Sequence, residues 1–172
     1  DYLPTPNDLP PVEAIKVGSE DEIVKLPPDI SGSLLGLAFK VVTDPFVGRL
    51  VFFRLYSGTI EQGAQVYNSS RNERERVGRI MKMHSNSRED VDALYAGEIG
   101  AAIGLKDTFT GDTISSRDNQ LLLESITFPD PVISVAIEPK TRDDQQKLSE
   151  AIQKLAEEDP TFKVRFDEET SQ

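Results

Sequence analysis

The stretch LAFKVVTDPFVGRLVFFRLYSGTIEQGAQVYN, residues 37–68, decides the fold class of this chain. It contains three short runs with the composition of β-strands, at Leu37–Val42, Leu50–Tyr56 and Ala64–Asn68. Asp-Pro, Ser-Gly and single glycines separate these runs, and such residues favour turns. In the middle run the residues Val51, Phe53 and Leu55 recur at every second position, which is the period of a strand with one buried face. The pattern predicts a mainly β fold with an antiparallel β-barrel at its centre.

A basic run follows these strands. Between Arg71 and Lys82 five basic side chains outnumber two acidic ones, and the alternation breaks near Gly78, as it does at a β-bulge. One interpretation is a solvated hairpin with weak surface ion pairs. The other is a strand edge that contacts phosphate groups of RNA. The candidate residues for that contact are Arg74, Arg76, Arg79 and Lys82, together with Arg49 in the preceding DPFVGR turn.

Composition argues against several classes of protein. The chain has no cysteine and a single histidine, so neither a disulfide framework nor a metal site of His and Cys is expected. It contains no signal peptide and no apolar run approaching ~20 residues, so we expect a cytoplasmic protein without a membrane segment. The net charge of −11 disfavours free-standing binding of DNA or RNA. Residues 33–126, with 12 acidic and 11 basic side chains, leave room for a local basic patch.

Three regions differ in composition. Residues 1–33 carry six prolines and an acidic run, which predicts a linker or an arm lying on the barrel. Residues 34–126 hold the predicted barrel. Residues 127–172 have the pattern of one β-α-β unit, with strands at Val132–Glu138 and Lys163–Phe166. Between these strands we expect a helix that starts at Thr141 and stops at Asp159-Pro160.

No catalytic chemistry can be assigned to these residues. The glycines at 58 and 63 have the spacing of a P-loop, but Ala64-Gln65 stands where Lys-Ser/Thr would hold phosphate and magnesium. No Ser/His/Asp set, carboxylate pair in an apolar setting or nucleophilic cysteine is present. We therefore expect no enzymatic activity, no cofactor and no metal ion in this chain.

A series of motifs, in this order along the chain, resembles the elongation factor G family of bacterial translational GTPases. The motifs are LAFK (37–40), TDPFVGRL (43–50), RLYSGT (54–59), RVGRI (76–80), MHSNSRED (83–90), YAGEI (95–99), GLKDT (104–108), TGDT (110–113), PDPVISVAIEPKT (129–141) and LAEEDPTF (155–162). The opening YLPTPNDLPPV also resembles the exit from the GTP-binding domain of that family.

The resemblance implies a domain assignment. Residues 1–33 would be the linker or arm from the GTP-binding domain, and residues 34–126 would be domain II, the translation-factor β-barrel. Residues 127–172 would be the first β-α-β unit of domain III, a ferredoxin-like α/β domain. By the same resemblance, Pro129, Pro131, Asp159 and Thr161 would lie near the interdomain interface that binds fusidic acid.

The resemblance also implies a function. Members of the family use GTP hydrolysis, with magnesium, to drive tRNA and mRNA through the ribosome. Because the GTP-binding domain is missing from this chain, the chain would be a non-catalytic module for ribosome docking and interdomain relay. Its partners would be small-subunit rRNA, a small-subunit protein and the other domains of the intact factor.

Two alternatives stay open. The chain could be the same region of another translational GTPase, of the ribosome-protection or release-factor type. It could also be an independent nucleic-acid-binding β-barrel, but such a barrel needs exposed aromatic residues for stacking, and aromatics make up only 7% of the chain.

A ferredoxin-like sheet contains two β-α-β units, and by the resemblance a strand of the second unit separates the two strands of the first. We therefore expect Val132–Glu138 and Lys163–Phe166 to lack their strand partners within this chain, which leaves backbone donors and acceptors unpaired.

The missing phosphate-binding loop yields a direct prediction. Because the chain lacks the phosphate cradle, the magnesium-binding hydroxyl and the base-reading motif, it should not bind GTP. Calorimetric titration with GTP and magnesium should give no saturable heat. A dissociation constant in the micromolar range would contradict the assignment.

Overall fold

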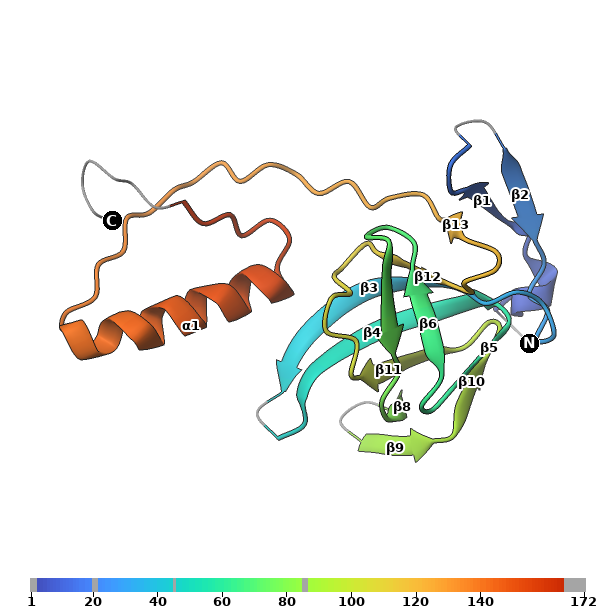
Figure 1. Ribbon diagram of the computed structural model, residues 1–172, viewed down its shortest axis with the longest axis horizontal. Coiled ribbons are helices and arrows are strands. Elements are labelled where there is room, and N and C mark those ends of the chain that lie inside the picture. Colours follow the sequence, from blue (N-terminus) through green and yellow to red (C-terminus); the bar gives the residue numbers. More distant parts are fainter. Residues whose placement is uncertain (1–2, 20–21, 45, 85–86, 166–172) are drawn as a thin grey trace. The chain divides into compact units, whose positions relative to one another are not determined.

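The computed structural model describes residues 3–19, 22–44, 46–84 and 87–165 (Figure 1). The chain divides into two compact units, Asp1–Ile126 and Thr127–Gln172. The first unit contains the 3-10 turn η1 (Pro6–Asp8) and the strands β1 (Val12–Lys16), β2 (Ile23–Leu26), β3 (Leu35–Asp44), β4 (Gly48–Ser57), β5 (Thr59–Glu61), β6 (Gln65–Asn68), β7 (Glu73–Arg76), β8 (Ile80–His84), β9 (Ser87–Val91), β10 (Ala93–Tyr95), β11 (Ile99–Ile103), β12 (Thr113–Ser115) and β13 (Leu121–Leu122).

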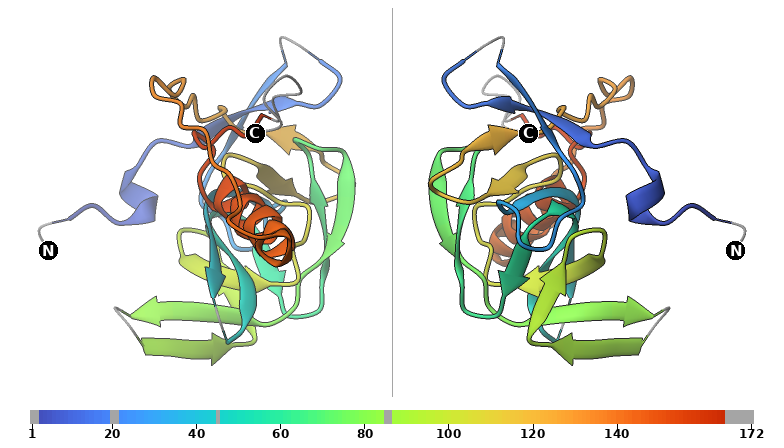
Figure 2. Two further views of the ribbon diagram at one scale, coloured as in Figure 1. Left: turned by 90° about the vertical axis from the view of Figure 1, so that its left-hand side faces the viewer. Right: turned by 90° about the vertical axis from the view of Figure 1, so that its right-hand side faces the viewer.

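The largest sheet has eight strands in the order β7-β6-β12-β3-β4-β11-β8-β9, and every neighbouring pair is antiparallel. The predicted strands at Leu37–Val42, Leu50–Tyr56 and Ala64–Asn68 are confirmed as β3, β4 and β6, with β3 and β4 longer than expected. The β8–β9 hairpin projects at one end of the barrel (Figure 2).

The segment between β7 and β8 closes this sheet into a barrel. The Val77 N–H donates to the carbonyl of Ala64, just before β6, at 2.9 Å. The N–H of the next residue, Gly78, donates to the carbonyl of Ile103, at the end of β11, at 2.7 Å. Val77 thus bonds next to β6 and Gly78 bonds to β11, two strands that are not neighbours in the sheet. The break in alternation near Gly78 therefore marks the point where the barrel closes.

The barrel interior explains the alternation in the sequence. Val51, Phe53 and Leu55 of β4 are buried and point inward, as predicted. They pack in one apolar cluster with Ala38, Val41, Ile60, Val66, Val77, Ile80, Leu94, Ala102, Leu105 and Ile114. Burial of this cluster is the main stabilising contribution to the barrel.

The N-terminal segment is more regular than its composition predicted. β1 pairs with β2 and with β13, forming a three-stranded sheet outside the barrel strands. Ala14 and Leu26 of this sheet are buried in a cluster with Leu35 of β3 and Leu121 of β13. The proline-rich segment therefore gains order by burying apolar side chains against the barrel.

The second unit contains the helix α1 (Arg142–Glu158), which confirms the predicted helix. The Thr141 hydroxyl accepts a hydrogen bond from the Asp144 N–H, as expected for an N-cap, and Asp159 forms the C-cap. No helix in the described part of the chain is both long and apolar enough to cross a membrane.

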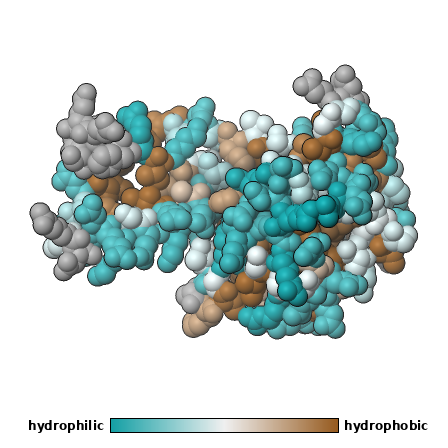
Figure 3. All heavy atoms as spheres, viewed as in Figure 1, coloured by the Kyte–Doolittle hydropathy of each residue, from teal (hydrophilic) through white to brown (hydrophobic). Residues whose placement is uncertain are grey.

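The two strands predicted beside this helix are wrong for the described residues. Residues 132–138 and 163–165 are not assigned to any strand, and Phe166 lies outside the described residues. Val132, Ile133 and Val135 are 95%, 79% and 77% exposed, and hydrophobic residues appear on the surface of this unit in Figure 3. The physical reason is the expected gap: each strand needs a neighbour that the described residues do not supply.

Closure at Gly78 makes this glycine sensitive to substitution. A Cβ atom there would lie 2.6 Å from the Ile103 carbonyl oxygen, so Gly78→Ala should destabilise the barrel by about 1–3 kcal/mol. In native-state hydrogen exchange, the amides of Val77 and Ile103 should lose protection before the other amides of β11, Ile99 to Ala102.

The matched control is Gly48→Ala. Gly48 has a φ of +80°, but no atom lies within 4 Å of the position that a Cβ would take there. This variant should cost stability through backbone strain without selectively exposing Val77 and Ile103. If both variants exchange alike at these two amides, Gly78 does not close the barrel.

Candidate nucleic-acid interface

Strand β7 presents two of the candidate arginines to solvent. Arg74 and Arg76 are exposed and alternate with the buried Glu75, so they project from the same face of the strand. The Arg76 Nε donates to the Gly63 carbonyl at 3.1 Å. Arg74 makes no ion pair with any residue that the structure describes, which leaves its guanidinium available to an external anion.

The next two candidates are paired with carboxylates. The Arg79 guanidinium lies 3.8 Å from the Asp90 carboxylate, and both side chains are exposed. The Lys82 Nζ donates to Glu98 Oε1 at 2.7 Å. The exposed Arg79–Asp90 pair contributes little to stability and exchanges readily with other partners, whereas the Lys82–Glu98 pair is partly buried. The structure therefore places Arg74 and Arg76 together, while Arg79 and Lys82 are each held by an acid on another element.

The Lys82–Glu98 pair shifts both ionisations. The hydrogen bond to Glu98 raises the pKa of Lys82. Partial burial of Glu98 opposes its charged form, but the hydrogen bonds from Lys82 and the Tyr95 N–H and the Lys82 charge together lower the pKa of Glu98. Both groups stay charged near neutral pH, so Lys82 keeps a positive charge at this surface.

Arg49, the fifth candidate, holds a loop of the barrel. Its Nη1 donates to the carbonyls of Leu105 and Lys106 at 2.5 and 2.7 Å, and its Nη2 donates to the carbonyl of Thr108 at 2.6 Å. Its guanidinium also lies 4.7 Å from the ring centroid of Phe109. These contacts anchor residues 105–109 against β4 and direct the guanidinium to the loop.

The turn before Arg49 is fixed by Asp44. Asp44 Oδ1 accepts hydrogen bonds from the N–H groups of Phe46 and Val47 at 2.9 and 3.0 Å. The other carboxylate oxygen pairs with Arg88 of β9. The Arg88 hydrogen bond, followed by the Phe46 N–H, lowers the pKa of Asp44 to about 2. The carboxylate is thus ionised at physiological pH and holds the N–H groups of Phe46 and Val47 just before β4.

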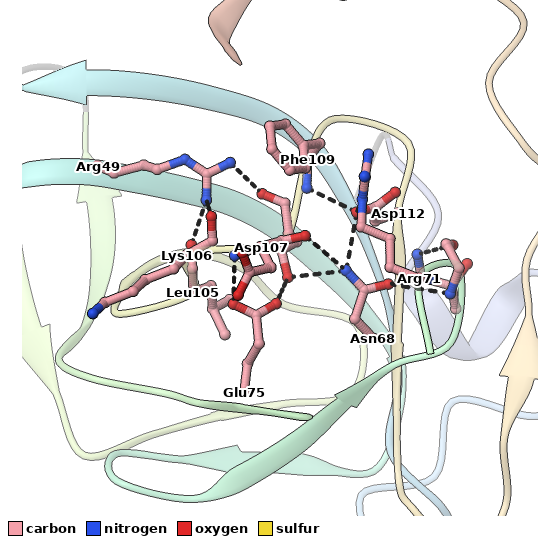
Figure 4. Close-up of polar contacts among 12 residues, drawn as sticks. Arg49, Asn68, Arg71, Glu75, Leu105, Lys106, Asp107, Phe109 and Asp112 are labelled. Atoms are coloured by element: carbon pink, nitrogen blue, oxygen red, sulfur yellow. Dashed lines mark hydrogen bonds and ion pairs between the residues drawn. The ribbon is translucent and has the colours of Figure 1, made fainter. Parts of the chain in front are cut away.

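A buried polar network lies beside this loop, and Figure 4 shows its contacts. Asp112 Oδ2 accepts hydrogen bonds from Asn68 Nδ2 and the Phe109 N–H, both at 2.9 Å. The Glu75 carboxylate accepts the Asp107 N–H at 2.9 Å and the Thr108 hydroxyl. The network joins the loop to the β6–β7 hairpin, which also carries Arg74.

Sequence reasoning missed one residue at this surface, Arg71. Its Nε donates to Asp112 at 2.7 Å, and its guanidinium lies 4.2 Å from the Phe109 ring centroid. Phe109 therefore contacts two arginines, Arg49 and Arg71. The only signal in the sequence was that Arg71 opens the basic run, because its partners lie about 40 residues further along the chain.

The candidates of the second unit lie in two segments joined by an ion pair. Pro129 and Pro131 are exposed and flank Asp130, which accepts a hydrogen bond from Lys163 at 2.5 Å. Asp159 Oδ1 accepts from the Thr161 N–H and hydroxyl at 2.8 and 2.7 Å. The Thr161 hydroxyl, then its N–H, lowers the pKa of Asp159. The Asp130–Lys163 pair brings the segment at 129–131 close to the segment that follows α1.

Comparison with known proteins assigns both units. Residues 48–115 match the family model of elongation factor Tu domain 2, and residues 128–172 match that of elongation factor G domain III. All 172 residues are 55% identical to elongation factor G of a Dehalococcoides mccartyi strain. The chain is therefore similar to elongation factor G along its whole length. The barrel corresponds to domain II of that family, and the residues from 128 onward belong to domain III.

The chain spans about a quarter of the length of these relatives. Elongation factor G from two further Dehalococcoides mccartyi strains is also 55% identical over the full chain, which covers 25% of each relative. A crystal structure of a protein from Thermus thermophilus superposes with a TM-score of 0.64 at 28% identity. It covers 81% of this chain, and the chain covers 21% of it.

The contacts of Arg49 predict a structural effect that Arg74 should not share. Arg49→Met removes the donors to three carbonyl groups and should lower the free energy of unfolding by about 1.5–3 kcal/mol. Arg74→Met, the matched control, should change it by less than about 0.5 kcal/mol. Urea unfolding of both variants measures the difference, and equal effects would contradict the anchoring role of Arg49.

Proposed function

We propose that this chain is the non-catalytic part of a translation elongation factor that docks on the ribosome and relays movement between domains. The proposal is carried by the 55% identity to elongation factor G across the whole chain. In the intact factor, GTP hydrolysis would drive the translocation of tRNA and mRNA. GTP and magnesium would bind to a GTP-binding domain outside this chain, in a cytoplasmic protein.

The exposed face of β7 is the proposed contact with small-subunit rRNA. Arg74 and Arg76 are exposed on one face of β7, and Arg79 and Lys82 follow along the chain. The Asp90 partner of Arg79 is an exposed carboxylate that a phosphate can replace, whereas the Glu98 partner of Lys82 is partly buried. Arg49 would act as a positioning residue, because it holds the neighbouring loop. Such contacts fix the orientation of the barrel on RNA without reading the bases.

In the second unit, the proposed interface with the rest of the factor and a small-subunit protein includes Pro129, Pro131, Asp159 and Thr161. Support comes from the ion pair that joins their two segments and from the exposed apolar residues beside them. Large exposed apolar areas commonly mark interaction surfaces. This interface would also be the side of domain III that faces fusidic acid in the family.

The RNA contact can be tested by the salt dependence of binding. Removal of one phosphate contact should reduce the slope of log K against log salt by about 0.7–0.9. Arg74→Gln and Arg76→Gln should therefore weaken binding of the chain to purified small subunits and flatten the slope, with thermal unfolding unchanged. Co-sedimentation over a potassium chloride series provides the measurement.

Arg117→Gln is the matched control, because Arg117 is exposed in a turn before β13 and has the same charge. It should leave the slope unchanged. If the variants at 74, 76, 79 and 82 all keep the wild-type slope, the basic run is only a solvated hairpin.

A further inference from the structure

A cavity of about 330 Å³ lies between the N-terminal segment and the barrel of the first unit. Its walls include Pro6, Leu9 and Pro10 on one side and Arg54, Tyr56 and Gly97 on the other. The volume falls within the range of small-molecule sites, and such sites are mostly apolar with a few polar groups. No acidic side chain lines this cavity among the described residues.

The wall formed by the N-terminal segment is preorganised. The Thr5 N–H and hydroxyl both donate to Asp8 Oδ2 at 2.8 Å, which closes the η1 turn. Prolines fix the backbone on either side of this turn. Pro6 rests directly on Gly97, where a Cβ atom would come within 2.6 Å of the proline ring. A ligand would therefore meet a formed cavity, which lowers the ordering cost of binding.

Arg54 supplies the polar group of the cavity. Its guanidinium lies over the Tyr56 ring at 5.3 Å from the centroid. Its Nε is buried, and none of the described residues accepts a hydrogen bond from it. A buried donor without a partner is costly, and a charged donor more so. Arg54 is also the one charged residue among the described residues that line the cavity, so a carboxylate of a bound molecule would pair with its guanidinium.

We propose that this cavity binds a small, flat, apolar molecule that carries one carboxylate. The carboxylate pairs with the planar guanidinium of Arg54, and the apolar ring packs against Leu9 and the prolines. A second charge on the ligand would have no partner among the lining residues. This site is separate from the β7 face and does not depend on ribosome docking. Because the ligand touches both walls, binding would also strengthen the attachment of the N-terminal segment to the barrel.

The probe is 1-naphthoate, titrated into the full chain with amide chemical shifts as the readout. We expect saturable shifts at Val12, Tyr56 and Gly97, and a higher melting temperature at saturation. Arg54→Gln should weaken 1-naphthoate roughly 10-fold to 100-fold. It should leave binding of the neutral 1-naphthamide nearly unchanged.

Two further variants test the site independently of Arg54. Arg117→Gln removes the same charge outside the cavity and should bind 1-naphthoate like the wild type. Leu9→Ala, at a partly exposed wall residue, should weaken both probes, which tests the cavity even if the Arg54 variant does not fold. Absence of saturable shifts, shifts away from the cavity, or equal binding of the charged and neutral probes by the wild type would overturn the proposal.

Discussion

The structure depends on the crossing at Val77 and Gly78, where one segment bonds to both sides of the sheet. The N–H groups of Val77 and Gly78 bond to Ala64 and Ile103, so this segment links β6 to β11 across the barrel. The crossing needs a residue without a side chain, because the Ile103 carbonyl lies against Gly78. Once the barrel is closed, each strand has a fixed inner and outer face. On β7, Glu75 is buried and bonds to the loop at 107–108, whereas Arg74 and Arg76 on the other face are exposed.

The second constraint is that buried polar groups must find partners. The loop at 105–112 carries carbonyls and N–H groups that the strands do not satisfy, and Arg49, Glu75 and Asp112 satisfy them. This requirement separates the arginines into two groups. Arg49 and Arg71 belong to the network around Phe109, whereas Arg74 stands outside it. A basic residue next to a candidate RNA surface is therefore not by itself a binding residue.

Strand-like runs separated by turn residues predicted β3, β4 and β6, and the cap at Thr141 predicted α1, because both signals are local in the sequence. Composition did not predict β1 and β2, since their stability comes from packing on Leu35 and Leu121 far along the chain. Among the candidate site residues, the sequence identified the basic run but not the partners of its members. The role of Arg49 depends on carbonyls more than 50 residues away, and no spacing rule describes such contacts.

The second unit shows the same distinction between local and distant signals. The helix α1 takes its backbone hydrogen bonds from its own segment. Its N-cap, Thr141, and its C-cap, Asp159, adjoin that segment, so the helix forms without a partner element. Residues 132–138 have equally strong β-propensity, but a strand takes its hydrogen bonds from a neighbour. The same apolar side chains that would be buried in a complete sheet are exposed here. Residues 132–138 thus keep the composition of a strand but have no strand neighbour among the described residues.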